Sequence, residues 1–355
     1  MTSKILYTMT LTVKRRILIS VFLLFLITIG TSGQSRLHLL TPPGDTLSLK
    51  EPFGLCATKD GTIYIADVGD HTIKQFKKHS ISVFAGTTKA GHADGPRHDA
   101  QFDSPSGIFQ SKNGSFYIAG FGEQRIRKIS TDGQVSTIAG TGKEGYRDGL
   151  ARKALFSSPR GICMDSKGNL FVCDCWNHRI RQITSDGIVS TFAGGGKRGE
   201  LVKNGWKDGQ DTAARFNAPC GISIDQYDNL YVADANNHCI RKFTPGGRVT
   251  TIAGQGAQKG FRDGPASQSL ANVPTEVFCA PDGNVYFSDT YNNRIRIITP
   301  AGIVHTLAGN GKAGFTNQSP LQSELNKPRG ITVVGNKLFF TEWSNHSLRY
   351  LKLHN

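Results

Sequence analysis

A proline opens the same pattern six times along this chain of 355 residues, and in five of the six copies a glycine follows two positions later. The six prolines, spaced 53 to 60 residues apart, are Pro52, Pro105, Pro159, Pro219, Pro274 and Pro328. A unit of this length is too small to bury its own hydrophobic face, so neighbouring units must pack against one another. The spacing therefore predicts a repeat architecture.

The third copy shows the strand pattern within one unit. Runs rich in β-forming residues at 159–164, 170–174, 179–183 and 188–194 are separated by turns that contain Gly, Asn and Asp. Four such runs joined by short turns predict an antiparallel meander, whose strands we call a, b, c and d. Sheets of this kind repeated around an axis form a β-propeller.

The two ends of the chain predict how the ring closes. The sixth copy stops after strand c, whereas residues 37–41 resemble an isolated strand d before the first copy. Pairing the two would remove the exposed edges of the open ring. We expect an all-β, six-bladed propeller of four-stranded antiparallel blades, closed by an N-terminal strand that completes the last blade.

Residues 1–33 have the organisation of a secretory signal peptide. Basic residues at 4, 14, 15 and 16 precede an apolar run at 17–30, and small residues follow. The run is short for a membrane span, which needs about 20 residues, although an uncleaved type II anchor is the alternative. We expect a secreted propeller at 34–355. Removal of residues 1–33 would reduce the net charge from +15 to +11.

Three glycosylation sequons agree with a secretory route. They begin at Asn113, Asn317 and Asn345. We expect glycans at these three asparagines in an extracellular protein.

The seven cysteines do not form a recognisable metal or disulfide pattern. Cys173 and Cys175 are spaced like a ligand pair, but Ala233 and Ala235 take the same places in the fourth copy. Packing of small side chains is the favoured interpretation, and disulfide pairing stays open.

Loop lengths distinguish the two faces of the expected ring. The a–b and c–d turns are tight and share a lower face. The b–c turns and the d–a connections share an upper face. The d–a connections are long, with 18 to 24 residues each. Four connections carry an Asp-Gly pair, at Asp94, Asp148, Asp208 and Asp263. We expect turns that fold each loop onto its blade, since one carboxylate per loop is too few for Ca²⁺.

The position after each repeat proline should approach the mouth of the central channel on the upper face. Its occupants are Phe53, Ser106, Arg160, Cys220, Thr275 and Arg329. Arg160 and Arg329 would favour an anionic group there. Glu276 replaces the repeat glycine in the fifth copy and is expected as a further ligand residue at the same mouth.

An aspartate recurs at the end of strand b, in four copies, and a histidine follows four residues later in three of them. The aspartates are Asp67, Asp174, Asp234 and Asp289, and the histidines are His71, His178 and His238. Because an active site is used once, we expect capping of the b–c turn and not catalysis. Two arginine pairs alternate on strand c, Arg179/Arg181 and Arg294/Arg296. We expect them between blades or on the rim, with the strand b aspartate as a partner.

The segments 170–181, 230–241 and 285–296 closely resemble NHL repeats, as in Leu-Tyr-Val-Ala-Asp-Ala-Asn-Asn-His-Cys-Ile-Arg at 230–241. The resemblance covers the chain from about residue 37 onward and implies a six-bladed propeller. It does not fix the function, because NHL propellers include protein-binding modules, RNA-binding modules and a few enzymes.

We expect a monomeric, non-catalytic binding module that presents its long-loop face to a protein or an anionic glycan. The alternative is a metal-dependent enzyme similar to the amidating lyase or the lactonases, but no residue after a repeat proline is His and Glu276 is the sole obvious acid near the mouth. We therefore expect no cofactor; Ca²⁺ or Zn²⁺ is the alternative, which the spacing of ligand residues does not support. Nucleic acid is not expected as a partner, because aromatic and basic residues do not alternate on the loops. A membrane is expected as a partner only if residues 1–33 are retained.

Overall fold

The computed structural model describes residues 37–40, 49–195 and 204–353, which belong to one compact unit. The predicted signal peptide at 1–33 lies outside the described residues. The helices among the described residues are single turns of three residues, and none of them could span a membrane.

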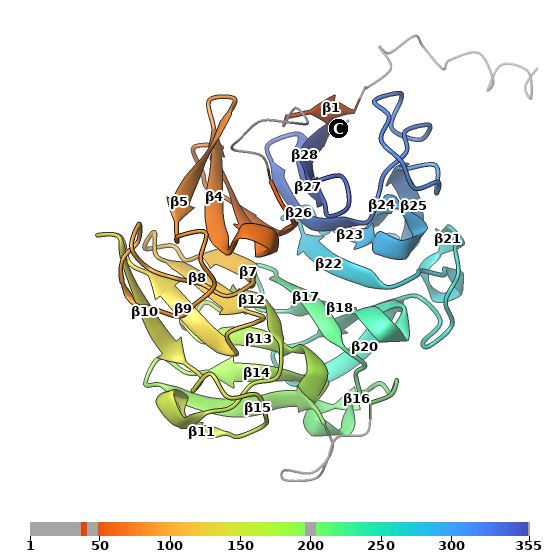
Figure 1. The fold of residues 1–355 in the computed structure, drawn as a ribbon. Coiled ribbons are helices and arrows are strands. Elements are labelled where there is room, and N and C mark those ends of the chain that lie inside the picture. Colours follow the sequence, from red (N-terminus) through yellow and green to blue (C-terminus); the bar gives the residue numbers. More distant parts are fainter. Residues whose placement is uncertain (1–36, 41–48, 196–203, 354–355) are drawn as a thin grey trace, which may run out of the picture. The chain divides into compact units, whose positions relative to one another are not determined.

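Six antiparallel sheets follow one another around an axis, and each repeat proline is the first residue of an innermost strand (Figure 1). Blade 1 holds β2 (Pro52–Ala57), β3 (Ile63–Asp67), β4 (Thr72–Lys77) and β5 (Ser80–Ala85). Blade 2 holds β7 (Pro105–Gln110), β8 (Phe116–Gly120), β9 (Arg125–Ile129) and β10 (Gln134–Ala139). Blade 3 holds β12 (Pro159–Met164), β13 (Leu170–Asp174), β14 (Arg179–Ile183) and β15 (Ile188–Gly194).

The second half of the ring repeats this order. Blade 4 holds β17 (Pro219–Ile224), β18 (Leu230–Asp234), β19 (Cys239–Phe243) and β20 (Arg248–Ala253). Blade 5 holds β22 (Pro274–Cys279), β23 (Val285–Asp289), β24 (Arg294–Ile298) and β25 (Ile303–Ala308). Blade 6 holds β26 (Pro328–Val334), β27 (Lys337–Glu342), β28 (Ser347–Lys352) and β1 (His38–Leu39). The six-bladed, all-β prediction is confirmed.

The ring closes as predicted, through the N-terminal strand. β1 pairs antiparallel with β28, with His38 opposite Tyr350 and Leu39 opposite Arg349. The His38 and Tyr350 rings stack with centroids 4.5 Å apart. Blade 6 is thus built from both ends of the described chain, which lie side by side in Figure 1.

Four blades carry a fifth strand that the sequence did not predict. These two-residue strands are β6 (Gly95–Pro96), β11 (Gly149–Leu150), β16 (Gly209–Gln210) and β21 (Gly264–Pro265). Each comes from a long d–a connection and pairs with the outermost strand of the next blade. The glycine of the Asp-Gly pair is needed here, because φ is +133° at Gly95 and +115° at Gly149.

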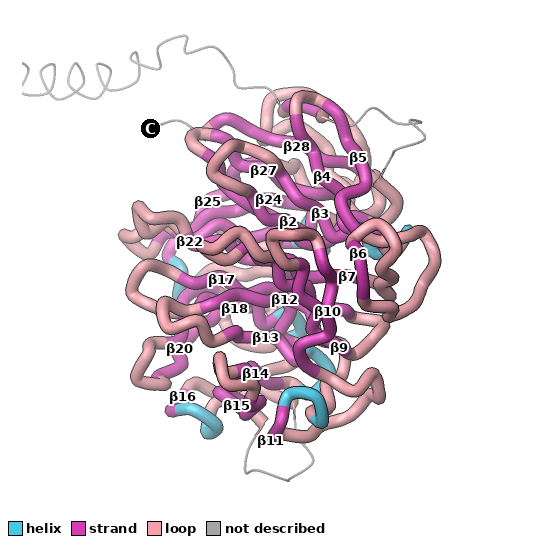
Figure 2. Tube along the Cα trace, turned by 90° about the vertical axis from the view of Figure 1, so that its left-hand side faces the viewer, coloured by secondary structure: helices cyan, strands magenta, loops and turns pink. Residues whose placement is uncertain are grey.

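Short 3-10 turns supply the only helical structure among the described residues (Figure 2). Those in b–c turns are η1 (Val68–Asp70), η3 (Cys175–Asn177), η5 (Ala235–Asn237) and η7 (Thr290–Asn292). Those in the long connections are η2 (Ala151–Lys153), η4 (Asp211–Ala213) and η6 (Ala266–Gln268). Both groups therefore lie in connections between strands.

The blades pack through apolar side chains between sheets and through glycine at the axis. Phe216, on the connection into blade 4, stacks on Phe243 with centroids 5.3 Å apart, in a cluster that also holds residues of blade 3. Near the axis, a Cβ added to Gly107 would lie 2.0 Å from the backbone oxygen of Arg160 in the next blade. A larger residue there would push the inner strands apart, so the repeat glycine sets how closely they approach.

The recurrent histidines join neighbouring blades. Each follows a 3-10 turn in the left-handed conformation, with φ of +52° at His178. The Nδ1 of His178 accepts a hydrogen bond of 3.0 Å from the backbone N–H of Ala218, which directly precedes the next repeat proline. His71 and His238 accept the same kind of bond from Ser104 and Val273. The histidines thus have a structural role between blades.

Candidate binding site at the channel mouth

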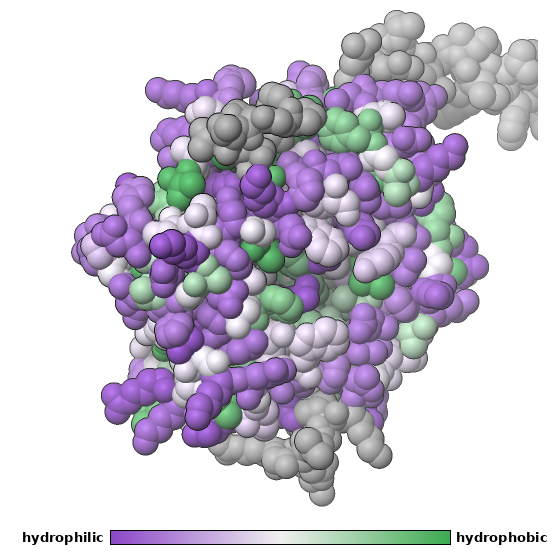
Figure 3. Space-filling model, in the orientation of Figure 1, coloured by the Kyte–Doolittle hydropathy of each residue, from purple (hydrophilic) through white to green (hydrophobic). Residues whose placement is uncertain are grey.

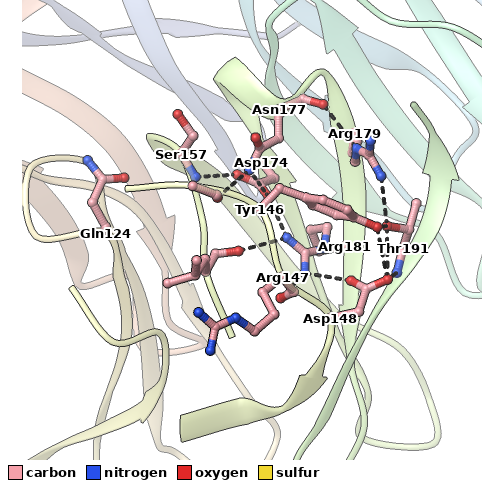
Figure 4. A network of polar contacts seen from close by, with 12 residues as sticks. Gln124, Tyr146, Arg147, Asp148, Ser157, Asp174, Asn177, Arg179, Arg181 and Thr191 are labelled. Carbon is pink, nitrogen blue, oxygen red and sulfur yellow. Dashed lines mark hydrogen bonds and ion pairs between the residues drawn. The ribbon is translucent and has the colours of Figure 1, made fainter. Parts of the chain in front are cut away.

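The aspartate at the end of strand b is bound to other groups of its own blade in the four blades that have it. In Figure 4, the buried Asp174 carboxylate accepts hydrogen bonds from the Ser157 N–H at 2.7 Å, the Asn177 amide at 2.8 Å and the Arg181 guanidinium at 2.6 Å. Asp234 and Asp289 are bound in the same way. The expected pairing is confirmed for Arg181 and Arg296. Arg294 instead donates to the backbone oxygens of Asn292 and Asn310, and in blade 1 Lys74 takes the place of the arginine beside Asp67. The expected capping is wrong in one respect, because Asp174 makes no cap hydrogen bond to the backbone of η3.

The aspartates of the long connections are bound to the same arginines. Asp148 lies 2.6 Å from Nη2 of Arg181 and accepts a hydrogen bond from the Thr191 N–H (Figure 4). Asp94, Asp208 and Asp263 make the equivalent ion pairs. The loops are therefore folded onto their blades as expected, but by an ion pair with strand c. These carboxylates already have a cationic partner.

Four of the six residues expected at the channel mouth meet there. We call Phe53, Arg160, Cys220 and Arg329 the mouth cluster. Phe53 and Cys220 are buried in one apolar contact group. The guanidinium carbons of Arg160 and Arg329 lie 5.2 Å and 4.5 Å from the centroid of the Phe53 ring. Blades 1, 3, 4 and 6 thus each contribute one side chain.

The other two expected residues are used between strands. The Ser106 hydroxyl donates to the backbone oxygen of Ala119 at 3.1 Å. The Thr275 hydroxyl lies 2.6 Å from that of Thr290, which donates to the backbone oxygen of Pro328. Both hydroxyls are buried and bonded, so they are not available to a partner.

The two arginines of the mouth cluster lack an acidic partner among the described residues. No carboxylate there lies within ion-pair distance of Arg160 or Arg329, and the Nε of each is buried without a hydrogen bond. The nearest polar contact of Arg160 is the Cys220 sulfur, 3.7 Å from Nη1. Burial lowers the pKa of Arg329 to about 10, and the charge of Arg160 acts in the same direction. Two guanidiniums therefore lie side by side without an ion pair to a described carboxylate, although Glu51 acts on Arg329 from a greater distance.

Aromatic side chains of the b–c turns stand beside these guanidiniums, and the sequence analysis missed them. Arg160 lies 4.6 Å from the Phe121 ring and Arg329 lies 4.3 Å from the Trp343 ring. Trp176 and Tyr291, in the corresponding turns of blades 3 and 5, are about half exposed. An aromatic residue just after strand b in four blades was the available signal. Figure 3 shows apolar side chains gathered around the hollowed centre of one face, inside a hydrophilic rim.

Glu276 is separate from the mouth cluster. It lines a cavity of about 290 Å³ inside the ring, which is formed by the innermost strands below the repeat glycines and which none of the mouth cluster lines. We call this space the lower cavity. Burial raises the pKa of Glu276 to about 8.

The remaining candidate residues have clear surroundings. All seven cysteines are unpaired, and Cys173 and Cys175 are buried, which supports the packing interpretation. Asn113 and Asn317 are exposed. The amide nitrogen of Asn345, to which a glycan would be attached, instead donates to Gly314 at 2.8 Å and to Glu342 at 2.9 Å. Within 37–40, 49–195 and 204–353, no group of three or more His, Cys, Asp or Glu side chains could hold a metal ion.

Comparison with known proteins agrees with the repeat pattern. The family model for the NHL repeat matches residues 49–76, 156–183 and 216–243. The chain is 32% identical over 283 residues to Protein SUPPRESSOR OF QUENCHING 1, chloroplastic, of Arabidopsis thaliana, covering 74% of this chain and 26% of that protein. It is 26% identical over 325 residues to NHL repeat-containing protein 2 of Gallus gallus, covering 82% of this chain and 45% of that protein.

A solved structure shares the fold. An auxiliary nutrient binding protein from Bacteroides ovatus superposes with a TM-score of 0.66 at 13% identity, covering 91% of this chain and 77% of that one. At this identity the likeness shows the fold alone. The chain spans less than half the length of the two curated relatives.

Proposed function

Since this chain is an NHL-repeat β-propeller, we propose that it is a secreted, non-catalytic binding module whose upper face holds an anionic group of a protein or a glycan. One observation carries the proposal: two guanidiniums of the mouth cluster, that of the buried Arg329 and that of the half-buried Arg160, lack a carboxylate within ion-pair distance among the described residues. A buried charge is costly unless it is paired. A carboxylate or sulfate from a partner would supply the missing charge to both arginines.

The surroundings of the mouth cluster suit such a partner. Arginine presents a planar fork of donors that matches carboxylate and sulfate oxygens. The half-exposed rings of Trp176 and Tyr291, in b–c turns of the same upper face, offer flat apolar surface. Aromatic residues and arginine are the side chains that most often dominate binding energy at interfaces. The anion would enter the mouth, and the rest of the partner would lie across the b–c turns.

The test compares wild type with the double variant Arg160→Gln/Arg329→Gln. Its matched control is Lys112→Gln/Lys167→Gln, which removes two exposed charges from the a–b turns of the lower face. Binding of heparin, of polygalacturonate and of a poly-glutamate peptide is measured at fixed ionic strength, so that sulfated glycan, carboxylated glycan and acidic protein are separate arms.

We expect the double variant to bind the preferred anion at least about tenfold more weakly, which corresponds to about 1.4 kcal/mol. The control should bind like wild type. Equal binding by the double variant, or a larger loss in the control, would show that general surface charge accounts for the interaction and that the mouth does not.

The compartment is part of the proposal and has its own test. We propose that residues 1–33 are removed and that the propeller is released from the cell as a monomer. N-terminal sequencing of protein recovered from the medium should start near residue 34. A retained N-terminus in a membrane fraction would favour the type II anchor instead.

A further inference from the structure

We propose that the lower cavity is a second binding site, for a small molecule with an apolar body and one primary ammonium group, and that Glu276 is the counter-ion of that group. This inference is independent of the proposed function, because the mouth cluster and the lower cavity share no lining residue.

The lower cavity is enclosed by the whole ring. Its lining comes from the innermost strand of every blade, namely β2, β7, β12, β17, β22 and β26. One aliphatic side chain per blade contributes, three positions after the repeat proline: Leu55, Ile108, Ile162, Ile222, Val277 and Ile331. A concave, largely apolar space of this kind is typical of small-molecule sites, in which a few polar groups fix the orientation.

Glu276 is the one carboxyl group that lines this space. It stands where the other five blades have glycine, and a Cβ added to the neighbouring Gly221 would lie 2.1 Å from its Oε1. The carboxyl group therefore lies at the level where the inner strands approach one another most closely. The apolar lining extends from there toward the a–b ends of the strands.

The carboxyl group is poorly compensated by the protein. Its Oε1 accepts one hydrogen bond, of 3.2 Å, from the adjacent Val277 N–H. Among the described residues, no Lys, Arg or His lies within ion-pair distance of it. The titratable groups coupled to Glu276 are the thiols of Cys163, Cys173 and Cys220. Burial raises the pKa of each thiol, so none of the three is charged at neutral pH.

An ammonium group fits this environment better than a metal ion does. Ca²⁺ takes six to eight oxygen ligands and Zn²⁺ about four ligands, whereas the lower cavity offers one carboxylate. An ammonium group needs one anion and uses its apolar substituent to fill the remaining space. Binding would also shift Glu276 to its ionised form, because the bound cation replaces the missing positive charge.

The experiment uses 2-phenylethylamine as the probe and 2-phenylethanol as its neutral analogue. Calorimetric titrations with the full propeller are carried out between pH 6 and pH 9, where the amine keeps its charge. We expect the amine to bind at least about tenfold more tightly than the alcohol at pH 9, with affinity rising as pH rises and Glu276 ionises. The alcohol should bind with the same affinity across this range.

Two variants make the result specific. Glu276→Gln keeps the size of the side chain and should remove both the preference for the amine and its pH dependence. Glu276→Asp keeps the charge and should retain the preference. The double variant Arg160→Gln/Arg329→Gln should keep the preference for the amine over the alcohol, which separates this site from the channel mouth.

Three outcomes would overturn the proposal. The first is wild-type binding of the amine weaker than about 10 mM, which is below any useful affinity. The second is equal affinity for the amine and the alcohol at pH 9. The third is an amine preference that survives in folded Glu276→Gln, with folding checked by circular dichroism.

Discussion

Replacement of Arg329 by methionine should make the propeller more stable, although it removes a buried residue with many contacts. Arg329 is 8% exposed and has no carboxylate partner among the described residues. Burial lowers its pKa from 12.5 to about 10. The guanidinium proton is therefore bound more tightly in the unfolded chain than in the folded one. Below pH 10, where Arg329 is charged in both states, this difference lowers the free energy of unfolding by about 3 kcal/mol.

The gain is smaller than this cost because Arg329 also contacts aromatic rings. Its guanidinium lies 4.5 Å from the Phe53 ring and 4.3 Å from the Trp343 ring. Each contact contributes about 0.5–1 kcal/mol or more, and methionine keeps part of it through sulfur–aromatic contacts. We expect Arg329→Met to raise the free energy of unfolding by about 1–2 kcal/mol and to raise Tm by a few degrees.

The matched control is the same substitution at Arg241. Arg241 is fully buried and lies 2.8 Å from both Asp234 and Asp208. Its removal leaves Asp234 buried without a cation, which costs about 3–5 kcal/mol. The two arginine-to-methionine variants should therefore change stability in opposite directions.

Urea unfolding at pH 7, followed by far-UV circular dichroism, measures both changes. Sulfate should raise the Tm of wild type more than sodium chloride of equal ionic strength does, through binding to the folded state and through its general exclusion from protein surfaces. Only the binding part should be lost in Arg329→Met, so the difference between the two salts should be smaller there. The reasoning is refuted if Arg329→Met loses 1 kcal/mol or more, as a paired arginine would.

Three further predictions concern acid, glycans and thiols. Burial lowers the pKa of His178 and of His238, so each stays neutral in the folded protein. The free energy of unfolding should therefore decrease as pH falls below about 6.5, the pKa of histidine in the unfolded chain. In urea unfolding at pH 7 and pH 5, His178→Asn should reduce this decrease; an unchanged pH dependence would show that His178 does not cause it. Mass spectrometry of the secreted protein should find no glycan at Asn345, whose amide nitrogen is already bonded in the folded blade. A high occupancy there would mean that the glycan is attached before the sixth blade folds. A thiol reagent should label all seven cysteines in denaturant but few of them in the folded protein, because six are buried; fewer than seven in denaturant without reductant would reveal a disulfide.

The sequence was sufficient for the ring and for the pairing inside each blade. Each repeat proline is the first residue of an innermost strand. Because the proline has the same place in the backbone of every copy, its period in the sequence is also the period of the blades. The Asp174–Arg181 pair was predictable for the same reason, since both positions recur together. The fifth strands were missed because two residues carry no periodic signal.

The site was predicted only in part, because a strand places successive side chains on opposite sides. Arg160 and Arg329 directly follow their repeat prolines and lie in the mouth cluster. Glu276 is two residues after its proline and lines the lower cavity. Thr275 has the same position as Arg329 in its own repeat, but a hydroxyl is short enough to bond to Thr290 between strands. Neither outcome could be read from spacing alone.

The pairing of β1 with β28 has a consequence for how the protein is made. During synthesis the strand that completes the wheel emerges first and must wait for its neighbour, which emerges last. Until β28 has been made, blades 1 and 6 cannot pack against each other. Nor can the Thr341 hydroxyl donate its hydrogen bond to the Phe53 carbonyl, 288 residues away in the sequence. A propeller with five complete blades leaves the ring open at two edges. Each edge can pair with the corresponding strand of a second molecule. Dimers that exchange this strand should therefore be the characteristic misassembled product at high rates of expression.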